Sequence, residues 1–204
     1  IPAPSISPLL IGAGETKNHA FAITIPHVLA GTYNGELTIS ESGKPEVNDT
    51  MSYVLTVNPV KVLDVLTYDE VNALVVTSEE DKTKTKIFTV KNTGSMDIIL
   101  NPVTSFSYNQ DDFSDNGDDI LLNFIPNPET ISPGEESTVT LNIEIPSRID
   151  IGKYEGIINV SDGAASDTFK LEIRIQPEVC EEGIVGDLEI RDVDFDEDDF
   201  VPGG

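Results

Sequence analysis

Between residues 131 and 177 the chain alternates apolar and polar residues with a period of two in three consecutive runs. This period is typical of β-strands that bury one face. Turn-forming residues bound the runs at Ser132-Pro133-Gly134, at Pro146 to Gly152 and at Asp162-Gly163. The pattern therefore predicts three antiparallel strands that form the second half of a β-sandwich. Their apolar positions are Val139, Leu141, Ile143 and Ile145, then Tyr154, Ile158 and Val160, then Phe169, Leu171, Ile173 and Ile175.

The same half-domain occurs a second time, in residues 6 to 59. Ile25-Pro26 aligns with Ile145-Pro146, and GTYNGELTIS from residue 31 aligns with GKYEGIINVS from residue 152. Both copies keep the two glycines, the tyrosine, the apolar alternation and the final serine in register, and both end in proline. An internal repeat of this kind marks a modular array.

These boundaries predict three regions. Residues 1–59 are expected to be the C-terminal half of an immunoglobulin-like domain, and residues 60–177 a complete domain. Residues 178–204 are expected to be a connector plus the opening strand of a further repeat, or a donor strand. The predicted fold class is all-β, with tandem immunoglobulin-like antiparallel β-sandwiches of which the first is incomplete. That first half supplies about four of the roughly seven strands that such a sandwich needs.

Three segments carry a resemblance to a known family. They are FTVKNTGSMDIIL from residue 88, FIPNPETISPGEESTVTLNIEIP from residue 124, and GKYEGIINVS from residue 152. Their Asn-Thr-Gly-Ser turn, Pro-Gly-Glu turn and Gly-x-Tyr-x-Gly strand resemble the hydin-like and CARDB-like immunoglobulin-fold repeats of archaeal and bacterial surface proteins. The resemblance covers residues 60–177 and the half-domain before them. It implies architecture and an extracellular, cell-surface or adhesive setting, and it implies no chemistry.

The net charge of the chain limits the classes of molecule that it can bind. The chain has 12 Lys and Arg against 37 Asp and Glu, a formal net charge of -25. Such a field repels nucleic acid and anionic lipid and attracts cations, so no nucleic-acid binding is expected.

No apolar run approaches the roughly 20 residues that span a bilayer. The start lacks a Met and a signal peptide, which favours a processed chain or a fragment. The single Cys180 allows no internal disulfide, and its pairing state stays open.

No cofactor is required by the sequence, and calcium is the one candidate. If Gly117 takes the sixth position of a calcium loop, Asp112, Ser114 and Asn116 take the first, third and fifth. Asn123 stands at the twelfth position, where a bidentate Glu is expected. The alternative is a solvated acidic turn that uses Asn-Gly for positive φ. The first candidate calcium ligands are Asp112, Ser114, Asn116 and Asp118.

A weaker cation candidate lies near the end of the sequence. On a strand, Asp192, Asp194 and Asp196 would project from one face, where a calcium ion could stiffen a joint between repeats. The alternative is a solvated acidic linker. Two segments also fit the N-glycosylation pattern, at Asn48 and at Asn159.

No catalytic constellation is visible, and we expect no enzyme. His19 and His27 have no metal-ligand spacing. Tyr33 and Tyr154 each stand just inside a strand, as in the tyrosine corner of immunoglobulin-like sandwiches, where the hydroxyl bonds the backbone.

The expected function is a structural or adhesive extracellular repeat protein, either a spacer of a cell-surface protein or a subunit of a surface filament. An incomplete sheet exposes unpaired backbone, so neighbouring repeats or other copies of the chain would bind by strand addition. A segment of a longer tandem protein is the simpler interpretation. The alternative is a ligand- or carbohydrate-binding accessory module of a secreted enzyme. That alternative requires Tyr68, Tyr108 and Phe113 to lie exposed on one flat face.

Overall fold

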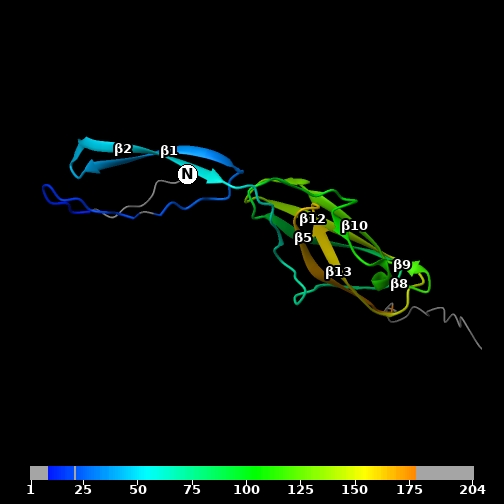
Figure 1. Cartoon of the computed structure of the whole chain (residues 1–204). Helices are drawn as coiled ribbons and strands as arrows, with labels where there is room; N and C mark the ends of the chain where they lie inside the picture. Colours follow the sequence, from blue (N-terminus) through cyan, green and yellow to red (C-terminus); the bar gives the residue numbers. More distant parts are fainter. Residues whose placement is uncertain (1–8, 21, 178–204) are drawn as a thin grey trace, which may run out of the picture.

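The computed structural model describes residues 9–20 and 22–177, and Figure 1 shows their arrangement. A β-sandwich follows a long β-hairpin, which extends from one end of the sandwich. The predicted all-β fold with antiparallel sheets is confirmed. Within the described residues the helical element is η1 (Gln110–Phe113), and no helix is long and apolar enough to cross a membrane.

The first sheet of the sandwich has four strands in the order β10-β12-β5-β3. They are β10 (Leu121–Asn127), β12 (Glu136–Ile145), β5 (Lys82–Asn92) and β3 (Leu63–Val65), and all pairings are antiparallel. Along β12, buried residues alternate with more exposed threonine, asparagine and glutamate, so the period-two pattern marks the face that points into the core.

The second sheet has the order β4-β14-β13-β7. It contains β4 (Leu74–Ser78), β14 (Ser166–Ile175), β13 (Gly152–Ser161) and β7 (Phe106–Ser107). Three of its strands are antiparallel, and β4 pairs in parallel with β14. Counted along the chain, the two sheets have the strand orders of the two sheets of an immunoglobulin constant-type domain. The added parallel strand β4 covers the outer edge of the last strand.

The inward faces of both sheets form one hydrophobic core. The rings of Phe88 on β5 and Phe169 on β14 meet across it with centroids 4.8 Å apart. Ile158 on β13 is fully buried and pairs across the strand with Phe169. Small elements close the ends of the sandwich: β6 (Ile98–Ile99), β11 (Thr130–Ile131), β8 (Ser114–Asp115) and β9 (Asp118–Asp119).

The hairpin consists of β1 (Gly31–Glu41) and β2 (Lys44–Val57). Residues 9–20 and 22–30 contain no strand, whereas the sequence predicted about four strands in residues 1–59. The reason lies in the equivalent segment of the complete domain. There β12 forms a strand because β5 and β10 flank it on both sides. Ile23 and Ile25, which correspond to Ile143 and Ile145, have no such flanking strands in the described part of the chain.

Candidate functional site

The Asn92-Thr93-Gly94-Ser95 turn is held rigidly from within the sandwich. The Asn92 side chain is fully buried. Its amide nitrogen donates to the carbonyls of Met96 at 2.7 Å and Ile131 at 2.8 Å, while its oxygen accepts the Gly94 N–H at 3.0 Å. Since every polar group of a buried amide is costly to leave unpaired, this network fixes the turn in one conformation.

The outward side of this turn binds the connector between hairpin and sandwich. The Ser95 N–H donates to the Val60 carbonyl at 2.7 Å, and the Val60 N–H donates back to the Ser95 hydroxyl oxygen at 2.9 Å. The same hydroxyl donates to the Asn58 carbonyl at 2.6 Å. Thr93 N–H adds a bond of 3.1 Å to Val62. The backbone of the connector is therefore hydrogen-bonded to the turn at Asn58, Val60 and Val62.

The preceding half-domain also contacts this end of the sandwich directly. The Ala30 N–H donates to the Ser95 carbonyl at 2.7 Å. A Cβ added at Gly134, which has a φ of +85°, would lie 2.8 Å from Cβ of His27. Both turn motifs that carry the family resemblance therefore face the preceding half-domain. Around them is a shallow hollow of about 230 Å³. It is lined by Pro26, His27, Val28, Val57, Val60, Val62, Thr93, Gly94 and Ser95.

The sequence did not assign these residues to a joint. Gly94, Ser95 and Gly134 were expected only as turn residues, and turn chemistry does not tell which neighbour a turn contacts. The available signal was positional, since Val60 to Val62 directly follow the proline that ends the first copy. We call the hydrogen-bonded contact of residues 58–62 and Ala30 with residues 93–95 the joint.

Both predicted tyrosine corners are present. The Tyr154 hydroxyl donates to the Asp150 carbonyl at 2.9 Å, and the Tyr33 hydroxyl donates to the Leu29 carbonyl at 2.6 Å. In immunoglobulin-like sandwiches this bond occurs near the start of the penultimate strand. The hairpin strands β1 and β2 thus correspond to β13 and β14, the last two strands of the complete domain.

The hairpin presents an apolar face that the complete domain would bury. Ile39 on β1 corresponds to Val160, and Met51 on β2 corresponds to Phe169, by the matching strand registers. Val160 and Phe169 are fully buried, whereas Ile39 is 62% and Met51 50% exposed. This face therefore has the apolar residues of a sandwich core. Among the described residues of the hairpin only Leu37, at its centre, is buried.

The hairpin is also open along its edges. In the complete domain β4 pairs with the edge of β14, and β7 pairs with the edge of β13. Among the described residues β1 and β2 pair only with each other. A two-stranded hairpin is marginally stable in water, and unpaired N–H and C=O groups form a template for another strand. The joint and the open hairpin together form the candidate functional site.

The predicted calcium loop adopts a hairpin between β8 and β9. Asn116 and Gly117 form its tip with φ values of 47° and 89°, as a type I′ turn requires. Ser114 donates its hydroxyl to the Gln110 carbonyl at 2.7 Å, and Asp112 accepts from the Asn109 amide at 3.1 Å. Within residues 9–20 and 22–177, no group of three His, Cys, Asp or Glu side chains is placed to hold a metal. Calcium at Asp112, Ser114, Asn116 and Asp118 stays a prediction.

The second cation candidate lies outside the described residues, as does Cys180. Of the glycosylation candidates, Asn48 is exposed in β2 and Asn159 points outward from β13, where its amide donates to the Ser107 hydroxyl at 3.2 Å. Neither site is tested by the geometry.

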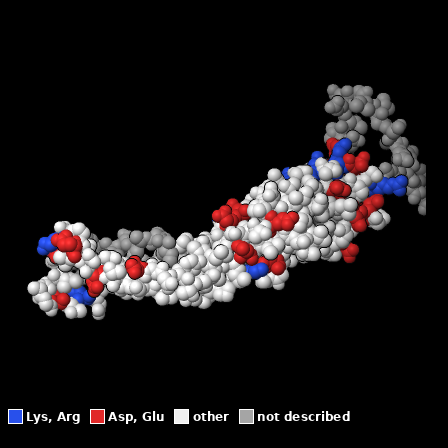
Figure 2. All heavy atoms as spheres, turned by 90° about the horizontal axis from the view of Figure 1, so that it is seen from above, with Lys and Arg blue, Asp and Glu red and all other residues white. Residues whose placement is uncertain are grey.

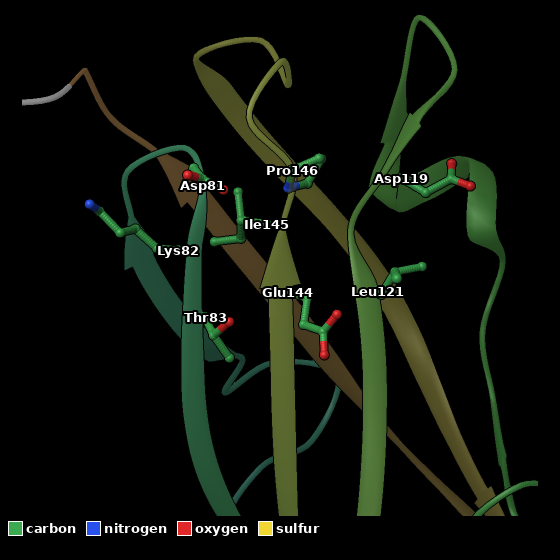
Figure 3. Close-up of a pocket in the computed structure, with 8 residues that line it drawn as sticks. All are labelled: Asp81, Lys82, Thr83, Asp119, Leu121, Glu144, Ile145 and Pro146. Atoms are coloured by element: carbon green, nitrogen blue, oxygen red, sulfur yellow. The ribbon is translucent and has the colours of Figure 1, made fainter.

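A shallow hollow of about 270 Å³ lies at the end of the sandwich remote from the joint. Figure 3 shows the carboxylates of Asp81, Asp119 and Glu144 spread around it rather than converging on one point. Leu121 and Ile145 also line it. This arrangement does not form a ligand cage.

Two carboxylates meet beside the Tyr154 corner. The pKa of Asp150 is raised, because Asp115 shares a hydrogen bond with it and repels its charge, and Glu80 adds to the repulsion. One oxygen of Asp115 is buried without a hydrogen-bond partner. Burial, followed by the charges of the same two aspartates, raises the pKa of Tyr154.

Replacing Asp150 by asparagine is expected to raise the melting temperature at pH 7. A folded-state pKa above the unfolded value means that the wild-type protein gains relative stability as the pH falls through that pKa. The advantage of Asp150→Asn should therefore disappear below about pH 3, where the wild-type carboxyl is protonated. Asp111→Asn removes the same charge from an exposed position and serves as the control. Equal effects of both substitutions, at both pH values, would contradict the prediction.

No family model matches the chain, and no curated protein matches it. Among solved structures, a protein of unknown function from Porphyromonas gingivalis W83 has 13% identity and a TM-score of 0.39, covering 72% of this chain and 66% of that one. A family 123 glycoside hydrolase from Clostridium perfringens has 13% identity and a TM-score of 0.38, covering 59% and 27%.

Titin domain M7 has 13% identity and a TM-score of 0.30, covering 58% of this chain and 99% of that one. This chain spans about two thirds of the Porphyromonas protein and about a quarter of the hydrolase. At these scores the likenesses carry no argument about function.

Proposed function

We propose that this chain is a structural segment of an extracellular, cell-surface array of immunoglobulin-like repeats. It acts as a spacer, or as a subunit of a surface filament joined by strand complementation. The joint carries the proposal. The Asn-Thr-Gly-Ser turn of the sandwich hydrogen-bonds to Ala30 before the hairpin and to the connector after it, so these segments are held against the sandwich instead of forming a free linker. The resemblance to hydin-like and CARDB-like repeats supports the surface setting.

The surface charge is consistent with this role. Figure 2 shows acidic side chains distributed over both the hairpin and the sandwich, with few basic side chains between them. With a net charge of -25, neighbouring arrays repel one another and stay separate in solution. Under this proposal calcium at Asp192, Asp194 and Asp196 would stiffen the connection to a following repeat, and its binding remains a prediction.

The alternative is a carbohydrate-binding accessory module of a secreted enzyme. Such a module needs exposed, coplanar aromatic rings. Phe113 is fully buried, and Tyr68 and Tyr108 are partly buried and pack against the core. The three rings that would have formed a sugar platform are thus used for packing. This observation favours the structural role, which is not enzymatic.

The spacer role is tested by distance measurements across the joint. In a Cys180→Ser background, spin labels at Ser42→Cys in the hairpin turn and Ser147→Cys at the far end of the sandwich are both exposed. A bound joint predicts one narrow distance distribution in electron double resonance. A broad distribution, like that of a flexible tether, would contradict the spacer role. A second pair of labels, at Asp97→Cys and Ser147→Cys, lies entirely within the sandwich. It gives the width of the distance distribution expected of a rigid body.

A further inference from the structure

We propose that the free edge of β2 accepts a parallel strand formed by residues 188–192 of a second copy of this chain. This inference rests on the proposed function and selects its filament form. It identifies the acceptor as the edge of β2 from Tyr53 to Val57. It identifies the donor as Leu188-Glu189-Ile190-Arg191-Asp192.

The complete domain provides the template for the pairing. There β4 adds in parallel to β14, with Leu74 beside Leu171, Val76 beside Ile173 and Ser78 beside Ile175. The hairpin registers place Val57 at the position of Ile175, because Gly31 pairs with the former as Gly152 pairs with the latter. Tyr53, Leu55 and Val57 are thus the edge positions that a strand equivalent to β4 would meet.

The donor matches β4 in sequence. Leu74-Val75-Val76-Thr77-Ser78 has branched aliphatic residues at its first and third positions and a small polar residue at its fifth. Leu188-Glu189-Ile190-Arg191-Asp192 has branched aliphatic residues at the same first and third positions and an aspartate at the fifth. It lies outside the described residues, so the match is one of sequence. In the template register Leu188 meets Tyr53, and Ile190 meets Leu55.

The charge distribution favours this edge over the edge of β1, the other strand of the hairpin. Residues 51–57 of β2 read MSYVLTV and carry no charge, in a chain with a net charge of -25. An acidic donor such as this one therefore meets no opposing carboxylate along the acceptor. Val54 and Thr56 flank Glu189 and Arg191 on the outward face in the same register. The β1 strand carries Glu36 and Glu41, whose charges would repel an acidic strand.

The donor must come from another molecule. Pro177 lies at the end of β14 remote from the joint, since β14 runs away from it over 10 residues, about 30 Å. The acceptor lies beyond the joint on the other side (Figure 1). Residues 178–187 span at most about 35 Å when fully extended, which is too short to pass back along the sandwich, across the joint and up to Tyr53.

Addition of one strand is sufficient for stability and leads to open polymers. It does not supply the missing opposing sheet. It converts the hairpin into a three-stranded sheet, the smallest that is stable on its own. The contact joins two different surfaces of the chain, so it is heterologous, and a heterologous contact that does not close into a ring gives a filament.

Two experiments test the proposal: one measures whether the chain assembles, and the other measures the register of the paired strands. The full chain, followed by light scattering and electron microscopy as its concentration is raised, is expected to form filaments. Ile190→Pro removes a backbone donor from the proposed donor strand and is expected to abolish assembly, whereas Ile190→Val is expected to retain it. Monomers of the unchanged chain at every concentration would overturn the proposal. Because the electron double resonance measurement is separate, a monomer with a narrow distance distribution would leave the spacer role intact.

Register is tested by disulfide formation between different copies. In a Cys180→Ser background, equimolar Val54→Cys and Glu189→Cys chains are mixed and oxidised, and a mixed disulfide dimer is expected to dominate. The control mixes Glu189→Cys with Ile39→Cys on the opposite edge strand, and should give at least tenfold less dimer. Equal yields from the two mixtures would overturn the proposed edge and register.

Discussion

Replacing Ile158 by alanine is expected to destabilise the sandwich by about 2–5 kcal/mol. Ile158 is fully buried within the core, so its removal loses apolar burial and leaves a cavity between the sheets. For a domain of this size the melting temperature should fall by roughly 10 °C or more. Thermal unfolding followed by near-ultraviolet circular dichroism, which reports the packed aromatic side chains, measures the effect.

Leu37→Ala is the matched control, because Leu37 holds the position of Ile158 in the first copy. It is buried, yet it lies outside the core cluster of the sandwich. The main transition should therefore keep its midpoint, while amide exchange in β1 and β2 becomes faster. If Leu37→Ala lowered the main transition as much as Ile158→Ala does, the hairpin would be part of one cooperative unit with the sandwich.

The architecture could be predicted from the sequence because its signals are local. Alternation along residues 139–145 and 169–175 fixes which face of each strand is buried. Because that face must point into the core, the pairing register of the strands is restricted as well. The tyrosine corners at Tyr33 and Tyr154 were predicted for the same reason. Each depends on one side chain and a carbonyl four residues earlier.

Contacts that depend on distant segments could not be predicted this way. The strand content of residues 9–30 was overestimated, because Ile23 and Ile25 alternate like Ile143 and Ile145 but lack flanking strands in the described chain. The role of Ser95 was missed for a related reason. Its partners, Asn58 and Val60, lie 37 and 35 residues away and are backbone groups, which leave no trace in the sequence.

The joint and the open hairpin have different consequences for assembly. The joint is already satisfied within one chain, since Ser95 uses its N–H, carbonyl and hydroxyl on the preceding half-domain and connector. Among the described residues, the hairpin still has unpaired edges and an exposed apolar face. Stiffness along the array therefore depends on the joint, and growth of a filament depends on the open hairpin.

Gly94→Ala is expected to release the joint without unfolding the sandwich. A Cβ at this position would lie 2.7 Å from the backbone nitrogen of Val62 and would also overlap the Val60 carbonyl oxygen. These are backbone atoms, so no side-chain rotation relieves the clash and the connector must move. Movement breaks the bonds of Ser95 to Val60 and of Thr93 to Val62. At about 1 kcal/mol for each hydrogen bond, the loss is roughly 3 kcal/mol.

Hydrogen exchange and the label pair at Ser42 and Ser147 measure this release. The amides of Val60, Thr93 and Ser95 should lose protection by about two orders of magnitude, as 3 kcal/mol implies. The distance distribution between the labels should broaden. Gly152→Ala is the control, because an added Cβ there meets no atom within 4 Å and needs no unusual backbone conformation. If Gly94→Ala kept a narrow distribution and full protection, the joint would be held by apolar contacts around Val28 and Val57 instead of by the Asn92–Ser95 turn.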